Sequence, residues 1–136
     1  MPKLGKALGA GLVGLLLSGC QGGVPKSARQ LTSAQIQQAV GAAGQTVWGH
    51  DSGGNDFVAY RAPDGTMAMQ SGTFTDHGVW RVVPGNKICL KWHKIRDGVE
   101  TCLREYTEGN DIYNVLPDGS VASVVTRERP GNPDHL

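Results

Sequence analysis

The chain has 136 residues, of which 39% are hydrophobic, 18% charged and 6% aromatic, with 20 glycines. This length suits one domain and leaves no room for a second, substrate-binding domain. The formal charge is +1, and it becomes −1 without Lys3 and Lys6, which lie in a segment that we expect to be removed. A near-neutral chain lacks the basic surface that phosphate backbones require, so we expect no nucleic-acid partner.

The first residues, MPKLGKALGAGLVGLLLSGC, have the composition of an export signal. Two lysines precede a short apolar stretch, residues 7–17, as in a secretory signal peptide. The alternative is a transmembrane anchor, but an anchor needs about 20 apolar residues, and this stretch is shorter and rich in glycine. We therefore predict a signal peptide over residues 1–19.

The sequence Leu17-Ser18-Gly19-Cys20 resembles the lipobox of bacterial lipoproteins. Small residues let the chain enter the peptidase, and only a thiol can form the diacylglyceryl thioether. The resemblance implies that Cys20 is the lipidated mature N-terminus, and two or three acyl chains would anchor it stably. Gln21, in place of the Asp that retains such proteins at the inner membrane, favours the periplasmic face of the outer membrane. The alternative is an ordinary signal peptide that happens to contain a cysteine.

Residues 20–30 contain two glycines and a proline without an apolar period, which predicts a flexible tether after the lipid. We expect residues 31–136 to form a single β-rich domain that begins with a short helix over 31–40. Thr32 and Gln35 have the spacing of a capping box, and Leu31 and Ile36 that of a hydrophobic staple.

From Gln45 onward, short apolar runs alternate with turn sequences such as Pro63-Asp64-Gly65 and Pro117-Asp118-Gly119. A spacing of about ten residues between turns predicts an antiparallel meander. The expected fold class is mainly β: a short N-terminal helix, then about eight strands in a small lipocalin-like or partly open barrel. The strands are expected near residues 45–50, 56–62, 66–71, 73–83, 87–94, 99–106, 111–116 and 120–128.

After lipidation of Cys20, two cysteines remain, in a compartment that permits disulfides. If Cys89 lies opposite Cys102, Ile88 faces Leu103 on one side of the hairpin. Lys91 then faces Glu100 on the other side, and a shift of one residue would destroy both matches. We therefore predict a cross-strand disulfide on the solvent face. A redox pair or metal ligands are the alternatives, but the pair is not a CxxC and lacks the further ligands that zinc needs.

The sequence contains no HExxH, GxSxG or glycine-rich phosphate loop. Its pairs of neighbouring His and Asp, His50-Asp51 and Asp76-His77, lie at expected strand ends, and adjacent side chains on a strand point to opposite faces. We expect no enzyme, no cofactor and no metal. Metal binding by Asp76 and His77 with a third ligand is the alternative.

A small eight-stranded barrel is either filled by its side chains or just wide enough for one small ligand, and we expect a filled interior, with a ligand cavity as the alternative. Met67 and Met69 share one face of a strand, where we expect them to pack in the core; lining an adaptable pocket is the alternative. The side chains expected inside the sheet are those of Trp80, Val82, Ile88, Leu90, Trp92, Leu103, Tyr106, Tyr113 and Val115.

Nearly the whole of the expected domain carries short turn and core motifs in a fixed order. These are Leu31-Thr32 to Ile36, Val47-Trp48-Gly49, Tyr60-Arg61-Ala62-Pro63-Asp64-Gly65, Gly78-Val79-Trp80-Arg81-Val82, Cys89, Cys102, Pro117-Asp118-Gly119 and Pro130-Gly131-Asn132-Pro133. Their order resembles that in a family of small uncharacterised proteins common in alphaproteobacteria. The resemblance implies a secreted β fold with a disulfide and carries no catalytic residues, because every motif is a turn or core signature.

Two functions are compatible with these features. The first is a non-enzymatic, membrane-anchored periplasmic lipoprotein that binds an envelope protein or the cell wall, or supports envelope integrity. The second is a carrier or sensor that holds a small hydrophobic ligand inside the barrel. The residues of a ligand site and the oligomeric state do not follow from the sequence.

Overall fold

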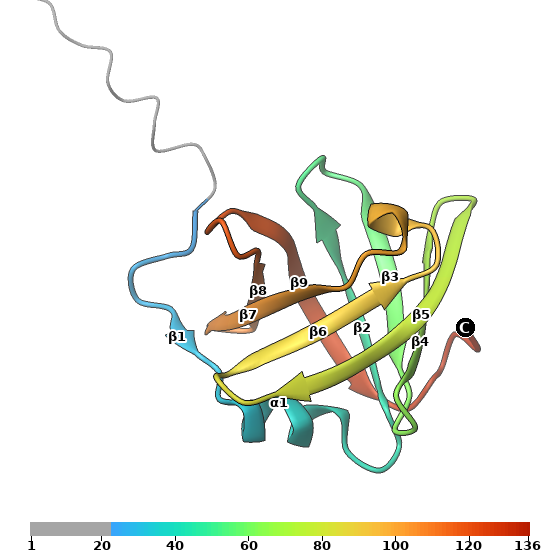
Figure 1. Ribbon diagram of the computed structural model, residues 1–136, viewed down its shortest axis with the longest axis horizontal. Coiled ribbons are helices and arrows are strands. Elements are labelled where there is room, and N and C mark those ends of the chain that lie inside the picture. Colours follow the sequence, from blue (N-terminus) through green and yellow to red (C-terminus); the bar gives the residue numbers. More distant parts are fainter. Residues whose placement is uncertain (1–22) are drawn as a thin grey trace, which may run out of the picture.

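Eight antiparallel strands close into a barrel in the computed structural model, which describes residues 23–136 (Figure 1). Each strand pairs with the next along the chain, and the last pairs with the first, so the barrel is closed and not an open sheet. The predicted signal peptide, Cys20 and the start of the predicted tether lie outside the described residues. The strands are β2 (Gln45–Asp51), β3 (Asp56–Arg61), β4 (Thr66–Ser71), β5 (Phe74–Val83), β6 (Lys87–Trp92), β7 (Thr101–Glu108), β8 (Asp111–Val115) and β9 (Val121–Pro130).

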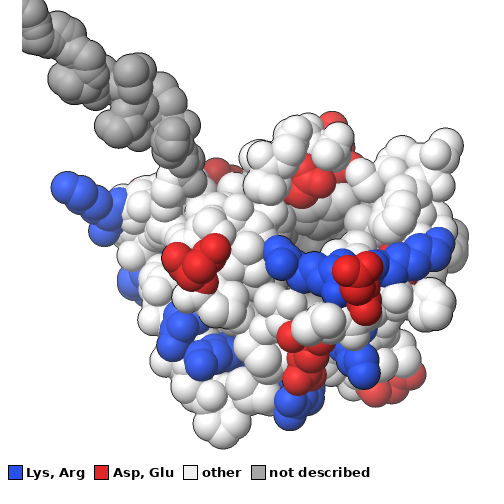
Figure 2. Space-filling view, turned by 45° about the horizontal axis from the view of Figure 1, so that its top comes forward, with Lys and Arg blue, Asp and Glu red and all other residues white. Residues whose placement is uncertain are grey.

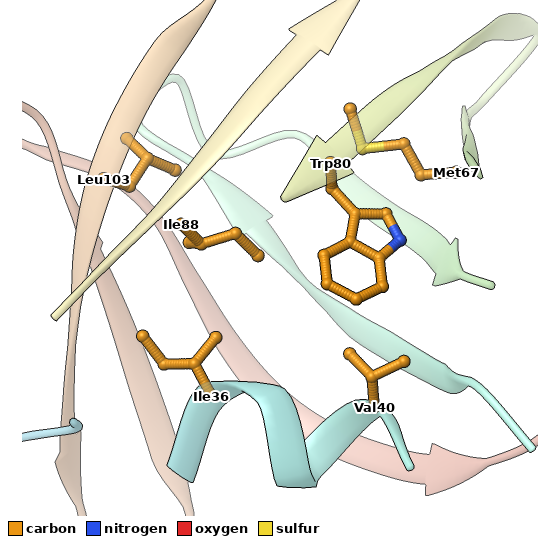
Figure 3. Packing of buried hydrophobic residues seen from close by; sticks show 6 residues of the cluster. All are labelled: Ile36, Val40, Met67, Trp80, Ile88 and Leu103. Carbon is orange, nitrogen blue, oxygen red and sulfur yellow. The ribbon is translucent and has the colours of Figure 1, made fainter. Parts of the chain in front are cut away.

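The helix α1 (Ser33–Val40) covers one end of the barrel (Figure 1). The predicted capping box is present: the Thr32 hydroxyl accepts a hydrogen bond from the Gln35 amide, and the Gln35 side chain accepts one from the Thr32 amide. Ile36 and Val40 are almost fully buried and point from α1 into the barrel (Figure 3). A helix of eight residues is marginal alone, so these contacts stabilise it.

The main core cluster lies directly above this helix (Figure 3). Trp80 is 6% exposed, and its indole nitrogen donates to the carbonyl oxygens of Ala62 and Thr66, so its one polar group is satisfied. The buried members of the cluster are Ile36, Val40, Met67, Trp80, Ile88 and Leu103, with Val82, Leu90 and Trp92 packed against them.

Two residues expected inside the barrel lie elsewhere. Tyr106 and Tyr113 are cross-strand partners on β7 and β8, and both are half-buried. They alternate with Glu105 and Asn114, which are buried, so the two tyrosines occupy the outer wall. The prediction was wrong there because Tyr106 and Tyr113 lie an odd number of residues from the inward-facing Leu103 and Ile112, and such positions on a strand point to opposite faces.

The folded part of the chain begins earlier than residue 31. A two-residue strand, β1 (Arg29–Gln30), pairs with Thr107 and Tyr106 on the edge of β7 that β6 leaves free. The Ser27 hydroxyl also donates to the carboxylate of Glu108. The interpretation of residues 20–30 as a flexible tether therefore does not hold for its last residues, since so short a strand produces no periodicity in the sequence.

The predicted register between β6 and β7 is confirmed. Cys89 lies opposite Cys102, and the two form a disulfide. Cys89 points outward but is only 1% exposed, so the expected solvent position of the bond is wrong for this cysteine. The expected partner of Glu100 also differs: its carboxylate accepts two hydrogen bonds from Arg81 on β5, at 2.9 and 3.0 Å. The pairing of β6 with β7 ends at Thr101, so the Glu100 side chain can extend past β6 to Arg81 on β5.

Two glycines allow neighbouring strands to approach closely. A Cβ atom at Gly49 on β2 would lie 2.1 Å from the carbonyl oxygen of Val124 on β9. A Cβ atom at Gly78 on β5 would lie 2.2 Å from the carbonyl oxygen of Lys91 on β6. The register between β2 and β9 shifts beside Gly49, so this glycine stands at a bulge, where barrels commonly turn their strands.

Residues 23–136 contain the closed barrel, its end helix, its core and both cysteines of the disulfide. We therefore expect this part of the chain to fold without the residues that precede it. No helix within it is long and apolar enough to cross a membrane.

Candidate ligand cavity

The barrel contains a cavity of about 370 Å³ that opens at the end opposite α1. This volume lies at the lower end of the range for small-molecule sites. Figure 2, in which the top of the molecule comes forward, shows a hollow with acidic and basic side chains near its rim. Asp51 at the end of β2 and Arg96 after β6 are charged residues of that rim.

One wall of the cavity is apolar. It is built by inward-facing positions of β3, β4 and β6, on which alternate residues point to the same side. Both methionines singled out in the sequence, Met67 and Met69, line it, and their flexible thioethers can adapt to a ligand. The apolar wall consists of Phe57, Ala59, Met67, Met69, Leu90 and Trp92.

A buried ion pair crosses the barrel at the inner end of the apolar wall. Arg61 on β3 and Glu105 on β7 belong to opposite strands of the ring, and Nη2 of Arg61 lies 3.2 Å from Oε2 of Glu105. Their side chains are 10% and 5% exposed. Arg61 lines the cavity, so this pair places a charged group beside the apolar wall.

On the facing side of the barrel, polar side chains form a row across three adjacent strands, and those of β8 and β9 line the cavity. Glu105 on β7 pairs with Asn114 on β8, which pairs with Ser123 on β9. Nδ2 of Asn114 donates to Oγ of Ser123 at 2.9 Å, whereas its Oδ1 is buried without a hydrogen-bond partner. Such an unpaired buried group costs about 1–3 kcal/mol. We call Arg61, Glu105, Asn114 and Ser123 the polar row.

The rim beside Arg96 has unusual backbone geometry. In the turn segment η2 (Ile95–Gly98), Arg96 and Asp97 have φ angles of 56° and 53°, in the left-handed region. Side chains with a Cβ disfavour this region, and such strain clusters at ligand sites and switches. Because Ile95 and Arg96 line the cavity, this strained segment borders its entrance.

Asp76, which the sequence offered as a metal ligand, has a structural role. The side chain is 4% exposed, and its carboxylate accepts hydrogen bonds from the backbone amides of His77, Lys94 and Ile95. His77 stacks on His93 with ring centroids 5.0 Å apart. Burial raises the pKa of Asp76, but the amides of Ile95, Lys94 and His77 outweigh it, and the net pKa lies below the ordinary value.

Replacing Asp76 by Asn should lower the free energy of unfolding by about 3 kcal/mol at pH 7, since charged acceptors contribute about 1.5–3 kcal/mol per hydrogen bond. Because the folded state lowers the pKa of Asp76, its contribution is present above the unfolded value, near 3.8, and is lost as pH falls further. Urea unfolding at pH 7 and pH 3 should therefore show a smaller difference between wild type and variant at pH 3. A difference of equal size at both pH values would contradict this account.

Asp51 and the two cysteines, which were also considered for catalysis or metal binding, have structural contacts. The Asp51 carboxylate accepts hydrogen bonds from the backbone amides of Asn55 and Gly53, and these bonds, that of Asn55 foremost, hold its pKa below the ordinary value. Cys89, Glu100 and Cys102 place a possible ligand atom within 4.8 Å of one another. In the disulfide, however, neither sulfur is the thiolate that binds metals.

The sequence did not single out Arg61, Glu105 or Asn114. The sequence did contain a pattern that points to them. Each lies two residues from an apolar, inward-facing residue of its own strand, namely Ala59, Leu103 and Ile112. An arginine and a glutamate on the apolar faces of two strands could have suggested an internal ion pair.

Searches of protein-family models, curated proteins and solved structures find no match for this chain.

Proposed function

We propose that this protein is a carrier or sensor that holds a small molecule inside its barrel. The observation that carries the proposal is the cavity of about 370 Å³, covered at one end by α1 and open at the other. An apolar cavity with a few convergent polar groups is the usual form of a small-molecule site.

The sequence placed binding of an envelope partner first and a small ligand second. We now place binding of a small ligand first, because the cavity offers a defined site for one. Within residues 23–136 we identify no surface of comparable definition for a macromolecular partner. Partner binding and support of envelope integrity remain predictions.

In this proposal the barrel acts at a membrane surface. The lipobox-like sequence ending at Cys20 supports a lipid anchor, and Gln21 supports the periplasmic face of the outer membrane in a bacterial envelope. A lipid anchor would confine the barrel near the bilayer, where apolar molecules concentrate. The cavity would then take up or present such a molecule without chemical conversion.

Native mass spectrometry of residues 21–136, purified from the periplasm of the source organism, tests the proposal. We expect an additional mass that disappears on denaturation. Filling the cavity with Ala59→Phe should remove this mass, whereas Ala68→Phe on the outer face of β4 should retain it. A bare chain in the wild type, together with no uptake of added apolar compounds, would contradict the proposal.

A further inference from the structure

The unpaired atom of Asn114 identifies where a ligand's polar group belongs. The residue is 4% exposed, lines the cavity and has one end of its amide bonded to Ser123. The other end has no partner, and this conclusion is the same in either orientation of the amide, because Ser123 can bond only one end. Gln45 also has a buried unpaired oxygen, but it does not line the cavity.

Arg61 offers donors at the same level of the barrel. A guanidinium has five N–H groups, and within the described chain the ion pair of Arg61 with Glu105 is made through Nη2. Glu105 is also the direct cross-strand neighbour of Asn114. The polar row thus presents donors of Arg61 and an unpaired group of Asn114 on either side of one carboxylate.

The charges of the polar row favour an uncharged ligand group. A carboxylate on the ligand would approach Arg61, but Glu105, which does not itself line the cavity, already balances that charge at 3.2 Å. An ammonium on the ligand would meet the like charge of Arg61. A hydroxyl avoids both conflicts, because it donates one hydrogen bond and accepts others. It can donate to Oδ1 of Asn114 and accept from Arg61.

The volume favours a ligand of modest size, since about 370 Å³ lies at the lower end of the range for small-molecule sites. The apolar wall, with Phe57, Trp92 and two methionines, suits a flat or branched hydrocarbon body.

We propose that the cavity selects a small, uncharged molecule with a hydroxyl on an apolar body, and that the polar row binds the hydroxyl. This inference rests on the proposed function, since it requires that the cavity hold a small molecule. It adds the chemical class of the ligand and names Asn114 as the residue that determines the preference for a hydroxyl.

Three probes of similar shape test it by isothermal titration calorimetry at pH 7, with residues 21–136. We expect 2-naphthol to bind roughly tenfold more tightly than 2-methylnaphthalene, which corresponds to one hydrogen bond gained. The anion 2-naphthoate should bind most weakly. The Asn114→Leu variant should lower the ratio of the first two affinities clearly below tenfold by weakening 2-naphthol alone, since only the hydrogen bond from Arg61 then remains. The control Gln70→Leu, on the outer face of β4, should keep the wild-type ratio.

The outcomes separate this inference from the proposed function. If 2-methylnaphthalene or 2-naphthoate binds the wild type as tightly as 2-naphthol, the cavity holds small molecules but the preference for a hydroxyl is wrong. If Asn114→Leu keeps the full wild-type ratio, the assignment to Asn114 is wrong. If none of the three binds, the proposed function fails and this inference fails with it. Should Asn114→Leu not fold, the wild-type ratio alone decides whether the preference exists.

Discussion

Replacing Glu105 by Leu is expected to lower the free energy of unfolding by about 3–5 kcal/mol, the range for breaking one side of a buried ion pair. The variant leaves the Arg61 guanidinium inside the barrel without a counter-charge, where its side chain is 10% exposed. The penalty is the cost of an unpaired buried charge and does not measure the strength of the pair. Urea denaturation of residues 21–136 at pH 7 measures this change in the free energy of unfolding.

The double variant Arg61→Met with Glu105→Leu separates these two quantities. Because apolar residues of similar size remove both charges, we expect its stability to return to within about 1–2 kcal/mol of wild type. Glu100→Leu, which breaks the exposed pair with Arg81, should cost no more than about 1 kcal/mol. If Glu105→Leu is as mild as Glu100→Leu, the interior ion pair does not exist in solution.

Gly49→Ala should destabilise the barrel by about 3 kcal/mol or more, as expected for overpacking that only a backbone shift can relieve. The added methyl would lie 2.1 Å from the carbonyl oxygen of Val124, and no side-chain rotation can move that atom. The strands β2 and β9, which close the ring, would have to separate at their bulge.

The matched substitution is Gly54→Ala in the turn between β2 and β3. This glycine has a φ of 84°, and a methyl group added to it would meet no atom within 4 Å. Only the left-handed backbone therefore disfavours alanine there, by about 1–2 kcal/mol. Thermal unfolding monitored by circular dichroism compares the two variants. Equal losses would show that the close approach of the strands at Gly49 is relieved without cost.

Much of the fold could be predicted from the sequence because its signals are local. The capping residues Thr32 and Gln35 begin the helix, and the turns at Asp64 and Asp118 have the same structure, in which each carboxylate accepts from the residue two positions later. The pairing of Cys89 with Cys102 followed from alternation on two strands. Closure of the ring did not follow, since contact between β2 and β9 joins segments far apart in the chain.

The residues of the cavity were harder to predict, because they too are brought together from segments far apart in the chain. Its ion pair joins Arg61 and Glu105, which belong to strands on opposite sides of the barrel. The unpaired end of Asn114 depends on which neighbours the closed ring supplies. Local patterns revealed only the methionine pair, Met67 and Met69, as a possible pocket lining, and the structure confirms that position.

Closure of the ring also restricts how this protein can associate with others. In residues 23–136 each of the eight barrel strands has a hydrogen-bonded neighbour on both sides, so the sheet has no long free edge. An extended peptide therefore cannot join it by β-augmentation, and the barrel cannot template the edge-to-edge stacking that leads to aggregates. Any protein that recognises it must do so through side chains and loops.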